Sequence, residues 1–334
     1  MNSQDDTPNR TFQDLAAKDR QADKESHYEF LRRAGQAYKQ MLEQAEQIVL
    51  GQRTIFEGLA IAIAARGHCL LEGGPGMAKT TILHTLAKLL GLEFRRISLT
   101  PDMTPQDIVP IIDRPQNQDE SLFANVLLVE EINCARPITQ MTLLNAIQDE
   151  HWTPGQTRYS LPKPFFVVAT ETPIERDRVA SLTASQLDRF MMKLIAGHPS
   201  FEEEFELARR MAALSDHVIK PVMTRNDLIR LQELIPRTPV SDEVAEFAVS
   251  MIRKTRVEEP AETFEFLPQH VARGAGTSAL LALIRAAQSR AVLCGRSRTA
   301  KSDVRYVSKL VLRHRLVMQP TASLSSDDVI EQLD

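Results

Sequence analysis

The residues best suited to chemistry stand together in one stretch, Leu70–Thr81, which reads LLEGGPGMAKTT. Glycines let backbone N–H groups wrap a phosphate, because no side chain stands in the way. Lys79 supplies a point charge for phosphates, and Thr80 supplies a hydroxyl for Mg²⁺. The pattern predicts a phosphate-binding loop (P-loop) formed by Gly73, Gly74, Pro75, Gly76, Met77, Ala78, Lys79, Thr80 and Thr81.

The segments on either side of this loop support the assignment. Two apolar residues before it end a predicted strand, and ILHTLAKLLG after it has the spacing of a helix, whose N-terminus favours an anion. One position departs from the usual pattern, since Ala78 stands where a second glycine is expected. Alanine has the smallest side chain that carries a Cβ, so we expect the loop to close. The alternative, a chance glycine turn, does not explain both flanking elements.

A second group of candidate residues follows the apolar run Val126–Val129, where Glu130 and Glu131 stand next to each other. A buried strand that ends in acidic residues places carboxylates at the carboxyl edge of a parallel sheet, where ligands bind in α/β folds. One carboxylate can hold Mg²⁺ through water, and the next can polarise an attacking water. A further apolar run, Phe165–Ala169, ends in polar residues at the same predicted edge.

Composition limits the class of protein. The 334 residues are 43% hydrophobic and 25% charged, typical of a globular chain with room for two domains. A net charge of −4 gives no general sign of nucleic-acid binding. Three widely spaced cysteines predict buried thiols in a reducing compartment. There is no apolar run of about 18 residues and no signal-like N-terminus, so we expect a cytoplasmic protein.

The order of elements predicts the domains. Residues 1–26 are polar and predict a partly disordered arm, and a helix is expected from about His27 to Ile48. Gly51-Gln52 breaks that helix before a second one over 53–66. Apolar strands separated by helices then predict a parallel α/β core over 27–198. The segment TPDMTPQDIVP is expected to be irregular, residues 113–121 a loop and 151–161 a hairpin, and residues 199–334 an all-helical domain without strands.

Several segments in this order resemble the MoxR family of AAA+ ATPases over roughly residues 40–320. The resemblance implies a P-loop AAA+ core with a helical lid, assembled as a ring, commonly a hexamer, with ATP and Mg²⁺ between subunits. It also implies chaperone-like remodelling or activation of protein partners, often ones with a von Willebrand A domain. The segments are GQ, HCLLEGGPGMAKT, TPDMTPQDI, FANVLLVEEIN, LLNAIQDE, PFFVVATETPIE, QLDRF and VLRHRLVM.

The resemblance also implies roles for residues outside the P-loop. Gly51 and Gln52 would flank the adenine, Glu130 would help to hold Mg²⁺, and Glu131 would be the catalytic carboxylate, although two adjacent glutamates leave their order open. Arg189 in QLDRF would be the arginine finger that reaches the γ-phosphate of the neighbouring subunit. Without the family, a local surface ion pair between Asp188 and Arg189 would be the simpler interpretation.

Three positions depart from the family pattern. Glu130 replaces an aspartate, Thr172 replaces the asparagine of ATQNP in the sensor-1 position, and Ser278 replaces the sensor-2 arginine of GASPRA. Arg273 and Arg285 are nearby candidates for that arginine, but neither stands at the matching position. We therefore expect ATP binding to be retained and hydrolysis to be slow.

Two other functions are consistent with these motifs. A nucleotide-gated scaffold would use ATP to assemble the ring, with little turnover. A nucleic-acid motor is disfavoured, because the chain is acidic overall and lacks a basic groove interleaved with aromatic residues.

Overall fold

A five-stranded parallel sheet forms the centre of the fold in the computed structural model, which describes residues 12–112, 124–153, 158–171, 182–212, 218–258 and 266–333. The strand order is β2-β3-β6-β1-β7, so the P-loop strand β1 lies between β6 and β7. The prediction of a parallel α/β core is confirmed. The strands are β1 (Cys69–Glu72), β2 (Phe94–Ser98), β3 (Val126–Glu130), β6 (Phe166–Glu171) and β7 (Met192–Ile195).

Helices cover both faces of the sheet, because the central strands are apolar on both sides. Along β3, Val126 and Leu128 join the core that includes α1, α2 and α3, whereas Leu127 and Val129 join the core that includes α4 and α5. The helices of this part are α1 (Phe12–Ile48), α2 (Arg53–Ala64), α3 (Lys79–Leu89), α4 (Pro105–Ile112), α5 (Pro137–Asp149) and α6 (Ala184–Leu187), with a short 3-10 helix η1 (Ile132–Cys134).

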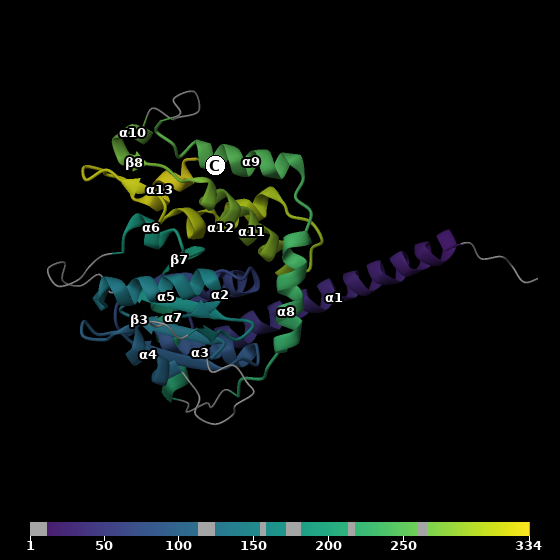
Figure 1. Ribbon diagram of the computed structural model, residues 1–334, viewed down its shortest axis with the longest axis horizontal. Coiled ribbons are helices and arrows are strands. Elements are labelled where there is room, and N and C mark those ends of the chain that lie inside the picture. Colours follow the sequence, from purple (N-terminus) through teal and green to yellow (C-terminus); the bar gives the residue numbers. More distant parts are fainter. Residues whose placement is uncertain are drawn as a thin grey trace, which may run out of the picture.

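The C-terminal part of the chain is a helical domain that lies against the β7 edge of the core (Figure 1). Helix α12 packs against β7, and α11 packs against both α1 and α2. The α1–α11 contact needs glycine, since a Cβ on Gly35 would lie 3.0 Å from the Cα of Gly295. The helices are α7 (Phe201–Ala212), α8 (Arg225–Leu234), η2 (Ile235–Arg237), α9 (Asp242–Arg253), α10 (Leu267–His270), α11 (Thr277–Leu293), α12 (Lys301–Leu312) and α13 (Ser326–Glu331).

The structure differs from the sequence prediction in three elements. Helix α1 begins at Phe12 rather than near His27, because the preceding segment contains good helix formers and no glycine or proline. TPDMTPQDIVP is not irregular throughout, since α4 begins at Pro105, where proline suits the first helical turn. Thr104 and Asp107 cap this turn, the Thr104 N–H donating to Asp107 Oδ2 at 2.8 Å. The helical domain also contains a small antiparallel pair, β8 (Val271–Arg273) with β9 (Val317–Met318).

The predicted hairpin over 151–161 is confirmed as the antiparallel pair β4 (His151–Trp152) and β5 (Tyr159–Ser160). The predicted loop 113–121 and the first 11 residues of the arm lie outside the described residues. Within the described ranges, no helix combines the length and the apolar character that crossing a membrane requires.

Candidate functional site

The P-loop connects β1 to α3 and leaves open space above its glycines. A Cβ on Gly74 or Gly76 would meet no atom within 4 Å, whereas a Cβ on Gly73 would lie 2.7 Å from the Cβ of Ala196. Gly76 also has a φ of +83°, which favours glycine. The loop therefore needs glycine for two different reasons, the close approach of Ala196 at Gly73 and the positive φ of Gly76, and the space beside Gly74 and Gly76 is open.

Lys79 and Ala78 complete the loop. The Lys79 Nζ donates to the Gly73 carbonyl at 2.6 Å and the Gly74 carbonyl at 3.2 Å, so its charge lies over the loop backbone. Ala78 has a φ of +50°, in the left-handed region where alanine costs about 1–2 kcal/mol more than glycine. The loop thus closes with alanine, as expected. Thr80 is half-buried in the first turn of α3.

Gly51 and Gln52 lie beside the loop that follows β7. The Gln52 side chain is buried, and its Nε2 donates to the Gly197 carbonyl at 2.9 Å. The preceding residue, Ala196, donates its N–H to the Glu72 carbonyl at 2.7 Å, directly before the P-loop. The structure therefore brings Gly51-Gln52 and the P-loop to the same edge of the sheet, which is the arrangement an adenine-flanking segment requires.

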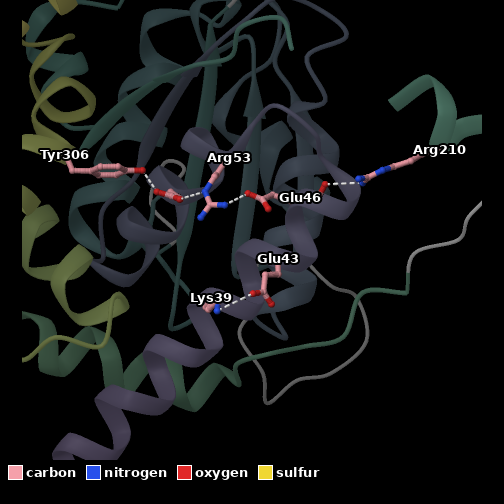
Figure 2. Close-up of polar contacts among 7 residues, drawn as sticks. Lys39, Glu43, Glu46, Arg53, Arg210 and Tyr306 are labelled. Atoms are coloured by element: carbon pink, nitrogen blue, oxygen red, sulfur yellow. Dashed lines mark hydrogen bonds and ion pairs between the residues drawn. The ribbon is translucent and has the colours of Figure 1, made fainter. Parts of the chain in front are cut away.

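A polar network fixes the helices on both sides of Gly51-Gln52 (Figure 2). Arg53 in α2 pairs with Glu57 at 2.8 Å and with Glu46 in α1. Glu57 in turn accepts a hydrogen bond from Tyr306 in α12, and Arg210 in α7 donates to the backbone carbonyl of Glu46 at 3.3 Å. The network thus joins the helical domain to the two helices that lead into and out of this segment.

Glu130 is the last residue of β3, and its carboxylate is already hydrogen-bonded to side chains of the neighbouring strand β2. Its Oε2 accepts hydrogen bonds from Arg96 Nε and Ser98 Oγ, both at 2.7 Å. Strand alternation places Glu130 on the face of Val126 and Leu128, the face covered by α3. The carboxylate is therefore on the correct face for a metal beside Thr80, but a metal must compete with the Arg96 guanidinium for it.

Glu131 is exposed and has an unusual backbone conformation. Its φ is +57°, and its N–H donates to Thr170 Oγ1 at 3.2 Å. Non-glycine residues in this region cost about 1–3 kcal/mol and occur often at functional sites. Cys134 Sγ donates to the Glu131 carboxylate at 3.7 Å. Burial and then the Glu131 charge raise the pKa of Cys134, so the thiol stays protonated and able to donate.

Two residues beside the P-loop were noted in the sequence only as the end of a strand. Thr170 is buried and supports Glu131, as described above. Glu171 is next to Glu72 in the sheet register, and Glu72 pairs with Lys193 on β7. Burial raises the pKa of Glu171, Lys193 lowers it, and Glu72 raises it further. Thr172, the predicted sensor-1 residue, lies outside the described residues.

Arg189 lies in the turn between α6 and β7. Its Nη1 donates to Asn145 Oδ1 on α5 at 2.7 Å, while Asp188 pairs with Arg315 at 2.7 Å. The alternative of an ion pair between Asp188 and Arg189 is therefore wrong, because Asp188 is held by an arginine from the helical domain. The turn is also anchored to the core, since the Met191 N–H donates to the His68 carbonyl at 2.8 Å.

His68 has a structural role in the sheet. It is buried, and its Nδ1 accepts a hydrogen bond from the Val167 N–H at 3.0 Å. Burial lowers the pKa of His68 to about 4, so the ring is neutral at physiological pH and bonds strand β6.

The sensor-2 position lies on a different side of the sheet from the P-loop. Ser278 is exposed at the start of α11. Further along the same helix, Leu281 and Arg285 line a groove together with Ala65 and Met191. Ala65 and Met191 precede β1 and β7, so this groove is at the amino edge of the sheet. Burial and then Arg66 lower the pKa of Arg285. Arg285 therefore does not substitute at this chain's own P-loop. Arg273 is exposed in β8.

Comparisons with known proteins show which chains and folds this one resembles. A family model described as "ATPase family associated with various cellular activities (AAA)" matches residues 68–192, and an AAA lid domain model matches residues 269–333. "Chaperone MoxR1" of Mycobacterium tuberculosis is 37% identical over 82% of this chain and 74% of its own length. "Uncharacterized protein YeaC" of Bacillus subtilis is 33% identical, covering 84% and 87%. The crystal structure of a candidate ATPase from Cytophaga hutchinsonii is similar with a TM-score of 0.81 and 29% identity, covering 93% and 97%.

Proposed function

Because the chain belongs to the MoxR family of AAA+ ATPases, a family of chaperone-like proteins, we propose that it binds Mg-ATP between the subunits of a ring. We propose further that it uses hydrolysis to remodel or activate protein partners. A hexameric ring, a partner with a von Willebrand A domain and a cytoplasmic location are parts of this proposal that the family resemblance suggests.

The observation that carries the proposal is the position of the finger turn, residues 188–191. Strand β7 runs parallel to β1 with Met192 opposite Cys69 and Ile195 opposite Glu72. The finger turn precedes β7, whereas the P-loop follows β1, so about 10 Å of strand separates them. Arg189, which is directed to Asn145 on α5, is therefore better placed for the nucleotide of a second subunit than for its own.

Exposed apolar side chains lie beside both halves of the proposed site. On α5, Ile138 and Met141 are 62% and 50% exposed and share a helix face with Asn145. Near Gly51, the rings of Phe201 and Phe205 on α7 stack on each other and are also exposed. Because large apolar groups in water favour burial in an interface, both patches support assembly of the finger side of one copy onto the nucleotide side of another.

Within the site, each residue has a proposed task. The P-loop backbone and Lys79 bind the phosphates, with Lys79 exchanging its carbonyl partners for phosphate oxygens. Thr80 and Glu130 would hold Mg²⁺, which when bound neutralises charge on the phosphates. Glu131 would polarise the attacking water, and its exposed carboxylate is free of the ion pair that engages Glu130. The Arg96–Glu130 pair and the exposed Ser278 support slow hydrolysis.

Complementation between two inactive subunits tests this function. Glu131→Gln should bind ATP without hydrolysing it, because the amide keeps the shape but cannot accept the proton. Arg189→Ala should also be inactive, because its neighbours lack a finger. Mixed rings should recover activity at interfaces where an intact finger meets an intact site. The measurement is steady-state phosphate release from each variant and from the mixture.

Three results would change the assignment. No recovery in rings shown to contain both subunits would contradict action of Arg189 between subunits. A block by Glu130→Gln but not by Glu131→Gln would reverse the roles of the two glutamates. One turnover per assembly, with no steady-state rate in the wild type, would favour the nucleotide-gated scaffold over a motor.

A further inference from the structure

A buried arginine of the helical domain, Arg315, donates several hydrogen bonds to the finger turn. Arg315, which follows α12, is 9% exposed. Its Nε donates to Asp188 Oδ1 at 2.7 Å, its Nη2 to the Phe190 carbonyl at 2.8 Å, and its Nη1 to the Met191 carbonyl at 3.0 Å. A longer contact of 3.2 Å joins Nη2 to the Asp188 carbonyl. The guanidinium therefore bonds residues on both sides of Arg189.

His314 adds a second contact from the same segment. It is buried, and its Nε2 lies 3.0 Å from the Phe190 carbonyl. Since a carbonyl oxygen only accepts, Nε2 carries the proton and donates. Burial and then the Arg315 charge lower the pKa of His314 well below its usual range, so the ring is neutral. The turn thus receives hydrogen bonds from two consecutive residues of the helical domain.

These contacts determine where the turn, and with it the arginine it carries, can lie. A guanidinium bonds several acceptors in one plane, so the carbonyls of Phe190 and Met191 keep a fixed orientation relative to α12. Losing the arginine would remove a hydrogen bond from the Met191 carbonyl and leave the Phe190 carbonyl with His314 alone, so the turn would lose its fixed orientation. Movement of α12 relative to the core therefore either carries the finger turn with it or breaks these bonds.

The helical domain has a different relation to the P-loop of its own subunit. The sensor-2 position is the exposed Ser278, and the start of α11 lies at the amino edge of the sheet. A serine there offers no charge to a γ-phosphate. This domain instead makes a charged contact with the finger turn, where Arg315 pairs with Asp188.

We propose that Arg315 is a positioning residue through which the helical domain of one subunit controls hydrolysis in the next, by fixing the turn that presents Arg189. This inference rests on the proposed function, in which Arg189 acts on the neighbouring subunit. It adds a direction of control, because the helical domain of one subunit would influence the nucleotide bound at the next subunit.

The test uses the mixed rings of Glu131→Gln and Arg189→Ala subunits and adds one further substitution, first to one kind of subunit and then to the other. Arg315→Lys keeps the charge but lacks the planar fork that bonds several acceptors together. In the Glu131→Gln subunit, which supplies the finger, it should lower the recovered activity roughly a hundredfold, as a misplaced catalytic group does. In the Arg189→Ala subunit, which has no finger to position, the recovered activity should stay within about twofold.

The two arrangements contain the same substitution in the same number of subunits, so a general loss of stability would lower both equally. An equal loss in both arrangements, or no loss in either, would overturn the inference while leaving the proposed function intact. Failure of the unsubstituted mixture to recover activity would refute the proposed function and the inference together.

Two further variants keep the test decisive if Arg315→Lys subunits do not assemble. Asp188→Asn removes the carboxylate that Arg315 Nε contacts but leaves the backbone carbonyls. It should therefore also lower the recovered activity more in the Glu131→Gln subunit than in the Arg189→Ala subunit, but by a smaller factor. Arg313→Lys is the matched control, because Arg313 pairs with Asp327 at 2.9 Å within the helical domain. It should lower stability without any difference between the two arrangements, and asymmetry with this control would contradict the specific role of Arg315.

Discussion

The P-loop and the finger turn are both short connections at the sheet, yet they are held in place by different kinds of contact. In the P-loop, Lys79 donates to the carbonyls of Gly73 and Gly74, six and five positions earlier in the chain. In the finger turn, Asp188 and Phe190 are bonded by Arg315, about 125 positions later. The difference implies that damage to the helical domain should disturb the finger turn more strongly than the phosphate contacts of the P-loop.

The largest expected effect that separates the two regions comes from Asp303→Asn. Asp303 is fully buried in α12, where its carboxylate accepts from Arg290 on α11 at 2.6 Å and from Arg296 at 2.7 Å. Removing one partner of a buried ion pair costs about 3 kcal/mol or more. We expect thermal unfolding to begin roughly 6–12 °C lower, and hydrolysis to fall as the finger turn loses its support. ATP affinity, measured by calorimetry at a temperature where the variant is folded, should change less than about twofold.

Glu243→Gln is the control for Asp303→Asn. Glu243 on α9 pairs with Lys301 on α12, the helix that contains Asp303, but the Glu243 side chain is 76% exposed. The melting temperature of Glu243→Gln should stay close to that of the wild type, because an exposed ion pair contributes little to stability. A large loss of ATP affinity in Asp303→Asn would contradict the independence of the P-loop from the helical domain.

The buried carboxylate of Asp303 should also make the stability of the protein depend on pH. Burial alone would raise the pKa of Asp303, but hydrogen bonds from Arg296, the Ala300 N–H and Arg290 outweigh it and lower the pKa. The stabilisation from the carboxylate is therefore present above its unfolded pKa of about 4 and is lost as the pH falls through the lower folded value. The difference in melting temperature between wild type and Asp303→Asn should be constant near neutral pH and shrink below about pH 4.

Lys79→Ala tests the opposite case, in which the P-loop is damaged and the finger is not. It removes the charge-assisted contact to phosphate, worth about 1.5–3 kcal/mol, so ATP affinity should fall at least tenfold to a hundredfold. Complementation provides a second measurement: Lys79→Ala subunits should still activate Arg189→Ala subunits, because their finger turn is intact. Unchanged ATP affinity would reject the P-loop assignment.

The smallest expected effect comes from the contact between Arg96 on β2 and Glu130 at the end of β3. Arg96→Gln removes the guanidinium that Glu130 now contacts, which frees the carboxylate for Mg²⁺. Arg96 is 52% exposed, so the ion pair is worth at most about 1 kcal/mol. The Mg²⁺ concentration needed for half-maximal hydrolysis should fall by roughly twofold to fivefold. Ser98→Ala is the control for loss of a neutral hydrogen bond, and an increased Mg²⁺ requirement in Arg96→Gln would show that Arg96 supports the site.

The sequence by itself was enough to predict a glycine loop, a parallel α/β core and a helical C-terminal domain. The glycines, Lys79 and Thr80 act within eight residues of one another, so their spacing is enough to predict the loop. The apolar runs before it and at Val126–Val129 and Phe165–Ala169 predicted buried parallel strands for the same reason, because burial on both faces is a property of each strand alone. Placing Glu130 and Glu131 at the carboxyl edge needed only the direction of the strand.

Only the tertiary structure decided what holds the other residues. Three contacts depend on elements that only folding brings together. They are the ion pair of Asp188 with Arg315, the hydrogen bond of Arg189 to Asn145 and the ion pair of Arg96 with Glu130. The segment VLRHRLVM contains Arg315, but nothing in its local pattern points to residues more than 120 positions away. The reason is physical: a buried guanidinium or carboxylate must find partners wherever the packed helices place them, and that placement follows from the packing of the whole core rather than from neighbours in the chain.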